Sequence, residues 1–240
     1  MPIKQKVRDL LNLLHLDLTK NLEYDRLTKL IMRRMLSSSS SCIDVGCHRG
    51  EMLEAMLRYA PTGKHFAFEP IPSFYNDLKS RYNGQVTILP YALSDRNGES
   101  SFQYIRNAPA YSGIKRRQYA VDNPLIEEIA VELRTLDAVI PSDLPIDLIK
   151  IDVEGAEFGV LLGARKVLKT FKPLVIFESG LGASDYYGTN PNELFSYLTS
   201  EIGLKISTLK AFIGKGQPLS RNGFLSCYDK TTEFYYIAHP

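Results

Sequence analysis

Short apolar runs alternate with segments of helical periodicity along most of the sequence, and this alternation constrains the fold more than any other feature. The runs CIDVG, KHFAFEP and PIDLIKIDVEG are each followed by a helix-like stretch, such as GEMLEAMLRYA or SFYNDLKSRY. The runs have strand length and are bounded by glycine, proline or acidic residues. Strands that alternate with helices predict an α/β fold in which an open, mostly parallel sheet is covered by helices on both faces.

The alternation breaks in two places. The last two strand-like segments, GLKISTLK and TEFYYIAHP, are joined by a loop without a helix, so we expect an antiparallel strand near one edge of the sheet. Between Asn97 and Val139, two further strand-like segments flank a polar loop. We interpret residues 97–139 as an insertion, and an insertion near the ligand-binding end of a sheet is a natural place for substrate selection.

Composition excludes several classes of protein. The 240 residues carry 29 basic and 27 acidic side chains, a balance that argues against a dedicated nucleic-acid-binding protein. Cys42, Cys47 and Cys227 show no C-x-x-C spacing, which favours free thiols in a reducing, cytoplasmic location. No stretch is long and apolar enough to span a bilayer, and the N-terminus lacks the uninterrupted apolar core of a signal peptide.

The N-terminal 36 residues are rich in leucine, but charges interrupt them every few positions. This pattern predicts one or two amphipathic helices that cover the core, form a lid or make a dimer contact. The serine run from Ser37 to Ser41 then marks a boundary. We therefore expect an N-terminal helical segment at 1–36 and a ligand-binding domain at 37–240.

The segment CIDVGCHRG places Asp44, Gly46 and Gly50 where the first core strand ends and a helix begins. Ligands of open α/β sheets bind at the carboxyl ends of the strands. The two glycines permit close approach of the backbone to a ligand, and the helix N-terminus offers free N–H groups. The pattern is not G-x-G-x-x-G, which weakens the interpretation as a dinucleotide-binding turn.

Two further acids follow later strands. Glu69 ends the second strand about twenty residues past the glycine turn, where a carboxylate can accept hydrogen bonds from ribose hydroxyls. Asp95, in ALSDRNG, would lie near an adenine amine or simply form part of a turn. The sequence thus supports an adenosine-containing ligand better than one with a pyrophosphate.

Acidic residues crowd around a later strand end in LIKIDVEGAE, and the following strand ends in Glu178. Asp152 and Glu178 should stand on neighbouring strand tips, with Glu154 beside them. One of the three carboxylates could act as a general base, or Asp152 and Glu178 could hold Mg²⁺. The structural alternative is helix capping together with an ion pair to Lys150.

The segments IDVGCHRG, FAFEP, ALSDRNG, TLD and LIKIDVEGAE, in this order, resemble FkbM-family S-adenosylmethionine-dependent methyltransferases. The similarity covers about residues 42–177 and extends more loosely through the last two strands, and KIDVEGAE is its most specific part. The resemblance implies a class I methyltransferase fold with a seven-stranded, Rossmann-like sheet. It also implies methyl transfer to a hydroxyl of a sugar, a glycolipid or polysaccharide precursor, or a natural product.

Under this resemblance, one set of residues contacts the cofactor and another acts on the acceptor. Catalysis falls to Asp152, Glu154 or Glu178, and His48 is a further candidate base. Basic residues of the insertion, Lys115 to Arg117, could meet a phosphate on the acceptor. The expected cofactor-binding residues are Asp44, Gly46, Gly50, Glu69, Asp95 and Asp152.

Other functions stay open at this point. A nicotinamide-dependent oxidoreductase or a non-catalytic nucleotide-binding module could use the same fold. Methylation of nitrogen in nucleic acid or protein is disfavoured, because the chain lacks an Asn-Pro-Pro-Tyr stretch and its charge is near neutral. We expect a hydroxyl-bearing small molecule or glycan as partner, no nucleic acid, and a homodimer through the N-terminal helices.

Overall fold

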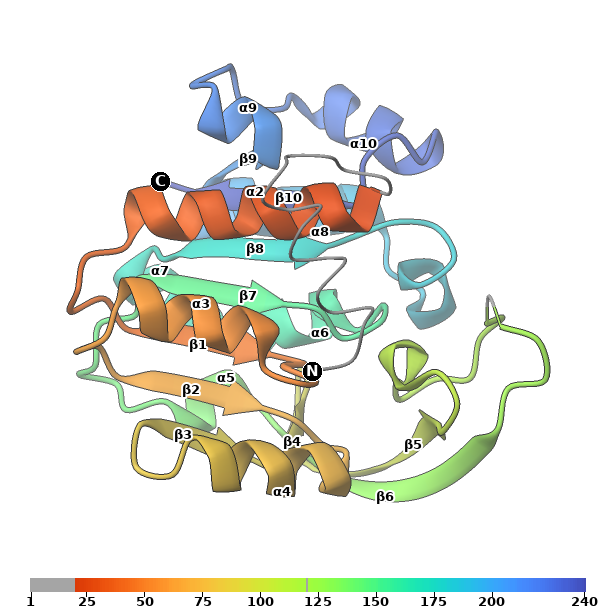
Figure 1. Ribbon diagram of the computed structural model, residues 1–240. Helices are drawn as coiled ribbons and strands as arrows, with labels where there is room; N and C mark the ends of the chain where they lie inside the picture. Colours follow the sequence, from red (N-terminus) through yellow and green to blue (C-terminus); the bar gives the residue numbers. More distant parts are fainter. Residues whose placement is uncertain (1–19, 120) are drawn as a thin grey trace.

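A central seven-stranded sheet organises the molecule in the computed structural model, which describes residues 20–119 and 121–240 (Figure 1). The strand order is β3-β2-β1-β7-β8-β10-β9. Across the sheet these strands are β3 (Val86–Leu89), β2 (His65–Phe68), β1 (Cys42–Val45), β7 (Leu148–Ile151), β8 (Leu174–Glu178), β10 (Tyr235–His239) and β9 (Lys205–Thr208).

The pairing confirms the predicted sheet. Strands β3, β2, β1, β7 and β8 run parallel, whereas β10 pairs antiparallel with both β8 and β9. Every residue of β1 and of β7 is buried, as expected for central strands covered on both faces. The carboxyl ends of β1, β2 and β7 therefore meet at one edge of the sheet, where a ligand has access to all three.

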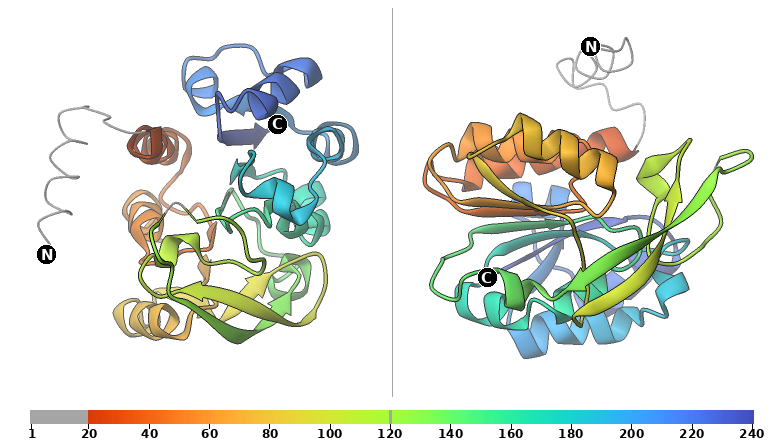
Figure 2. Two further views of the ribbon diagram at one scale, coloured as in Figure 1. Left: turned by 90° about the vertical axis from the view of Figure 1, so that its right-hand side faces the viewer. Right: turned by 90° about the horizontal axis from the view of Figure 1, so that it is seen from below.

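Helices cover both faces of the sheet (Figure 2). One apolar layer joins the sheet to α2, α3, α4 and α9, and the other joins it to α6, α7, α8 and α10. The first group comprises α2 (Lys20–Met35), α3 (Glu51–Tyr59), α4 (Pro72–Arg81) and α9 (Leu209–Ile213). The second comprises α6 (Glu157–Leu162), α7 (Arg165–Phe171), α8 (Pro191–Ser196) and α10 (Arg221–Asp229), with the short α5 (Leu136–Val139) beside α7.

The break between α6 and α7 differs from the sequence pattern, whereas the start of α8 agrees with it. The sequence pattern from about Glu157 to Thr170 predicts one helix, but the structure breaks it into α6 and α7, and Gly163 lies at the break. A Cβ at Gly163 would lie only 2.0 Å from the Ser94 carbonyl oxygen, so the chain can pass there only as glycine. Asn190 followed by Pro191 predicts the start of a helix, and α8 does begin there, since the Asn190 side chain accepts a hydrogen bond from the Asn192 N–H.

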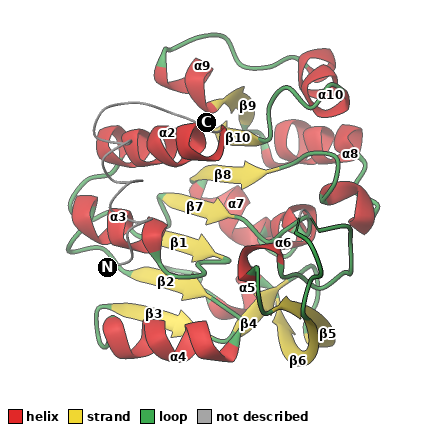
Figure 3. Ribbon diagram, turned by 45° about the vertical axis from the view of Figure 1, so that its right-hand side comes forward, coloured by secondary structure: helices red, strands yellow, loops and turns green. Residues whose placement is uncertain are grey.

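Two strands of the insertion, β5 and β6, form a second, three-stranded sheet with β4, in the order β4-β6-β5 (Figure 3). The stretch QVTILPYALS, which the pattern predicts as one strand, is split at Pro90, whose missing N–H cannot join a ladder. Its first half is β3 and its second half joins the new sheet. This region comprises β4 (Tyr91–Leu93), β5 (Gly98–Ile105), β6 (Ile126–Arg134) and the 3-10 turn η1 (Pro109–Tyr111).

Helix α2 is integrated into the first helical layer. Its buried face, which includes Tyr24, Leu27 and Ile31, packs in the same apolar cluster as α3 and α9. The expected helix within residues 1–19 lies outside the described residues. None of the described helices combines the length and the apolar character that crossing a membrane requires.

Candidate active site

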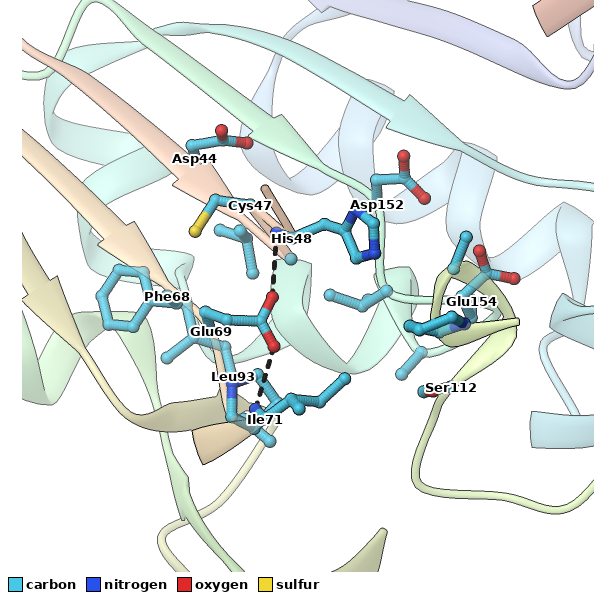
Figure 4. Close-up of a pocket in the computed structure, with 18 of the residues that line it drawn as sticks. Asp44, Cys47, His48, Phe68, Glu69, Ile71, Leu93, Ser112, Asp152 and Glu154 are labelled. Carbon is cyan, nitrogen blue, oxygen red and sulfur yellow. Dashed lines mark hydrogen bonds between the residues drawn. The ribbon is translucent and has the colours of Figure 1, made fainter. Parts of the chain in front are cut away.

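A pocket opens at the carboxyl ends of β1, β2 and β7, between the central sheet and the insertion (Figure 4). Its walls come from segments far apart in the sequence: the turn after β1, the end of β2, strand β4, the insertion and the loop after β7. The lining residues include Asp44, His48, Glu69, Leu93, Asp152 and Glu154.

The turn after β1 requires its glycines for different reasons. Gly46 has φ +74°, and a Cβ there would lie 2.0 Å from the backbone oxygen of Asp152, so the turn lies directly against the end of β7. Gly50, at φ +81°, precedes α3, and a Cβ there would crowd Leu78 at 2.8 Å. Gly46 lines the pocket, whereas Gly50 sets the position of the helix behind it.

Glu69 is fixed at the carboxyl end of β2 by backbone amides. One carboxylate oxygen accepts from the His48 N–H at 2.8 Å, and the other accepts from the Ile71 N–H at 2.9 Å. Burial, with only 3% of the residue exposed, raises the pKa of Glu69 to about 7, while the two N–H groups act in the opposite direction. Each oxygen keeps a free lone pair, so the group can accept further hydrogen bonds from a ligand's hydroxyls.

Asp44 is a buried carboxylate without a hydrogen-bond partner among the described residues. Its closest cation is Lys150, whose Nζ lies 4.0 Å from Oδ1. Burial raises the pKa of Asp44 to about 6, although the Lys150 charge opposes the shift. Because an unpartnered buried carboxylate is costly, this position suits a ligand that brings a positive group or a hydrogen-bond donor.

Asp152, just after β7, has two strong partners. The Lys150 ammonium lies 3.0 Å from its Oδ2, and the Tyr235 hydroxyl donates to the same oxygen at 2.6 Å. Burial acts to raise the pKa of Asp152, but Lys150 and Tyr235 hold it below its usual range. Asp152 is therefore a fixed, ionised carboxylate.

Glu154 is paired rather than free. It adopts the left-handed region at φ +59° and forms an ion pair with Arg117 of the insertion. Arg117 also donates to the Gly182 carbonyl oxygen at 3.2 Å, and Lys115 donates to the Tyr186 carbonyl oxygen at 3.2 Å. Arg117 and Lys115 therefore hold the tip of the insertion against the loop after β8, whereas the sequence pattern suggests that they meet an acceptor phosphate.

Glu178 lies outside the residues that line the pocket and joins a different group. One oxygen from each of Asp152, Glu157 and Glu178 lies within 4.8 Å of the others. A magnesium ion there would need Asp152, which already contacts Lys150 and Tyr235, and an adjacent ammonium disfavours a second cation. Binding of Mg²⁺ by Asp152 and Glu178 stays a prediction that these contacts weaken.

Asp95 is displaced from the pocket. It lies on an exposed turn, where Ser94 Oγ donates to its carboxylate at 3.1 Å and Arg96 contacts it at 3.3 Å. The preceding strand β4 belongs to the second sheet and carries the turn away, so that Ala92 and Leu93 line the pocket at this point instead.

Two site residues have no signal in the sequence motifs. Tyr235 reaches Asp152 from β10, across 83 positions of sequence, because β10 is inserted beside β8. Asp25 of α2 lines the pocket although it precedes every recognised motif. Both could have been found only by knowing which elements neighbour β7.

Comparison with known proteins agrees with this architecture. A methyltransferase FkbM domain matches residues 44–203. Methyltransferase sdnD of Sordaria araneosa is 30% identical over 162 residues, which are 53% of this chain and 61% of that protein. The 2-O-methyltransferase NoeI of Sinorhizobium fredii is 26% identical over 148 residues, which are 52% of this chain and 58% of that protein. The chain thus spans less than two thirds of the length of these relatives.

A solved structure is similar in fold. The methyltransferase FkbM from Methylobacillus flagellatus superposes with a TM-score of 0.52 at 16% identity, covering 85% of this chain and 44% of that one. At this identity the likeness concerns the fold alone, whereas the domain match spans most of the sheet and both glycine-turn and carboxylate segments. The chain belongs to the family of proteins that carry the methyltransferase FkbM domain.

Proposed function

We propose that the protein is an O-methyltransferase that uses S-adenosylmethionine and acts on a hydroxyl of a small molecule or glycan. The observation that carries this proposal is the division of the pocket into two ends. A hydrogen-bond-accepting carboxylate, Glu69, lies at one end, and an excess of negative charge lies at the other.

The charge at the second end selects the ligand class. Asp25, Asp44 and Asp152 all line the pocket, and against the effect of burial their charges raise the pKa of the Lys150 ammonium. The local excess of carboxylate favours a ligand with positive groups, and S-adenosylmethionine carries both an ammonium and a sulfonium. A dinucleotide would place its pyrophosphate near the same carboxylates, and like charges repel. This argues against a nicotinamide cofactor.

The remaining walls fit the parts of S-adenosylmethionine. Glu69 would accept hydrogen bonds from the ribose hydroxyls, and the apolar Ile71 and Leu93 would flank the adenine. Asp44 and Asp152 would face the amino group of the methionine end. The cofactor supplies an activated methyl group, and the protein holds an acceptor oxygen in line with it.

Oxygen as the accepting atom has two supports. The relative NoeI is named a 2-O-methyltransferase. In addition, the insertion contributes Ser112, Pro109 and Ile114 to the pocket, a mixture of polar and apolar surface suited to a hydroxylated acceptor. We further propose that 37–240 form the methyltransferase domain, that the chain is cytoplasmic, and that residues 1–36 mediate a homodimer.

The test uses S-adenosylmethionine labelled in its methyl group, together with a panel of para-nitrophenyl glycosides and the matching amino sugars. We expect labelled methyl ethers and no methylated amines. Tight binding of S-adenosylhomocysteine without transfer to any hydroxyl would favour a non-catalytic binding module. Methylated amines without any methyl ether would contradict the O-methyltransferase assignment.

A further inference from the structure

His48 is held in an unusual conformation at the mouth of the cofactor pocket. Its φ is +48°, in the left-handed region that non-glycine residues seldom occupy, and its N–H is fixed by the hydrogen bond to Glu69. The backbone is thus locked to the acid proposed to bind ribose. Figure 4 shows the His48 ring extending away from Glu69, toward the side where Asp152 and Glu154 lie.

The ring of His48 has a packing partner but an unsatisfied nitrogen. It stacks edge-on against Phe74, with ring centroids 4.5 Å apart and an interplanar angle of 68°. Its Nε2 is buried and has no hydrogen-bond partner among the described residues. A buried polar atom without a partner is costly, and a hydroxyl that donated to Nε2 would remove that cost.

The surroundings of the ring keep it in the basic form. Burial lowers the pKa of His48 below its ordinary value, and the cations Arg49 and Lys150 act in the same direction. Glu51 at the start of α3 and Asp152 after β7 act the other way without reversing the shift. The imidazole is therefore neutral near pH 7 and able to accept a proton.

The other candidate bases are engaged or misplaced. Asp152 is held by Lys150 and Tyr235, and Glu154 is paired with Arg117. Glu178 does not line the pocket. Asp44 accepts no hydrogen bond from the described residues, but it lies on β1 itself, across the pocket from the insertion residue Ser112 (Figure 4).

We propose that His48 is the general base of the reaction. As the acceptor oxygen attacks the methyl carbon, His48 Nε2 takes the hydroxyl proton, the new O–C bond forms and the methyl–sulfur bond breaks. S-adenosylhomocysteine leaves with the electron pair of that bond, and the imidazolium later releases its proton to water. Asp152 acts as a positioning residue whose negative charge stabilises the imidazolium. This inference rests on the proposed function.

The variant His48→Asn tests the role without disturbing the turn. Asparagine tolerates the left-handed region and keeps the N–H that donates to Glu69. We expect kcat to fall about 100- to 1000-fold, the usual contribution of general-base catalysis. The affinity for S-adenosylhomocysteine, measured by calorimetry, should change less than about two-fold, because the proposed role of His48 is to accept a proton during the reaction and not to bind the cofactor.

The pH profile separates a base from a structural residue. Wild-type kcat should fall on the acid side as His48 becomes protonated, and this limb should disappear in His48→Asn. The matched control is His239→Asn, since the pKa of His239 is also lowered but its Nε2 contacts Ser207 far from the pocket. That variant should keep the limb. A His48→Asn enzyme with kcat and acid limb like the wild type would overturn the proposal.

A second measurement needs no acceptor. In ¹⁵N NMR spectra of histidine-labelled protein bound to S-adenosylhomocysteine at pH 7.5, we expect His48 Nε2 to lack a proton, with the assignment given by His48→Asn. A proton on Nε2 would contradict the proposal. If the wild type methylates no compound of the panel, the protonation state of Nε2 is the measurement that decides whether His48 can act as the base. Absence of S-adenosylhomocysteine binding would instead remove the proposed function, and the inference with it.

Discussion

Buried Glu69 and half-buried Asp152 are acids at the ends of two strands that border the same pocket, yet their surroundings shift their pKa values in opposite directions. Two backbone N–H groups hold Glu69, and its pKa is raised to about 7. An ammonium and a phenol hold Asp152, and its pKa is lowered although burial acts to raise it. Neutral donors fix a carboxylate in place without fully offsetting its desolvation, whereas a cation does both.

Because of this difference, the two ends of the pocket suit different parts of a ligand. At the Glu69 end, a rigid acceptor surrounded by apolar walls suits an uncharged ligand group such as ribose. At the Asp152 end, ionised groups surround one lysine and suit a charged ligand group. Lys150→Met disturbs the Asp152 end of the pocket, and Glu69→Ala disturbs the opposite end.

The largest effect is expected from Lys150→Met. This change leaves the buried Asp44 and the half-buried Asp152 without their shared cation. Removing one member of a buried ion pair costs about 3–5 kcal/mol, so the free energy of unfolding in urea should fall by that amount. The control Lys169→Met removes an exposed pair with Glu201 and should cost less than about 1 kcal/mol. Equal losses in both variants would show that Lys150 is not the main partner of the acids.

At the other end, Glu69→Ala should weaken binding of S-adenosylhomocysteine about 100-fold, since hydrogen bonds to a charged group are lost and two N–H groups are left unpaired. Calorimetry measures the change. The exposed Glu99→Ala is the matched control and should bind as the wild type does. Normal binding by Glu69→Ala would exclude this carboxylate from the ligand site.

Glu157→Gln should stabilise the protein, and more so at high pH. Burial raises the pKa of Glu157 to about 7 in the folded protein. Above pH 7 the buried side chain is ionised and the full destabilisation is present. As the pH falls toward the lower pKa of the unfolded chain, the side chain becomes protonated and this destabilisation is lost. Glutamine keeps an oxygen for the N–H groups of Val153 and Gly155. The gain in unfolding free energy should be about 2 kcal/mol larger at pH 8 than at pH 5. A gain that is independent of pH would contradict a raised pKa.

A smaller loss is expected from Arg117→Ala, which frees Glu154 and the tip of the insertion. Stability should fall by about 1–2 kcal/mol, and amide hydrogens of residues 113–118 should exchange faster, while S-adenosylhomocysteine binding is unchanged. Arg117→Lys keeps the charge but loses the paired N–H groups, and should lie between. Unaltered exchange would show that other contacts hold the insertion closed.

The smallest effect concerns the metal. Because Asp152 is already engaged by Lys150 and Tyr235, we expect a chelator to change methyl transfer by less than about two-fold. Loss of activity with the chelator, and its recovery with Mg²⁺ but not with Na⁺, would restore the prediction of a magnesium site at Asp152 and Glu178.

The central sheet could be predicted from the sequence because short segments of neighbouring residues mark each of its strands. The short, fully buried strands β1 and β7, the spacing from Gly46 to Glu69, and the loop before β10 each follow from a few adjacent residues. The cluster of acidic residues after β7 could be predicted in the same way. The mostly apolar run LIKI and the glycine after Glu154 mark the end of this strand within ten residues.

The partners of those acids could not be predicted, because they depend on which distant elements meet. Tyr235 approaches Asp152 only through the antiparallel insertion of β10, and Arg117 reaches Glu154 only because the insertion folds back over the pocket. The chain breaks at Pro90, so β4 pairs with β6 in the second sheet, and Asp95 after β4 lies outside the pocket. Motif spacing carries no information about these contacts.

The most direct test of the two-ended pocket is a crystal structure of the protein with S-adenosylhomocysteine. The account predicts ribose hydroxyls within hydrogen-bonding distance of Glu69, adenine beside Ile71 and Leu93, and the amino group facing Asp44 and Asp152. A ligand bound in the reverse direction, or away from the ends of β1 and β2, would contradict it.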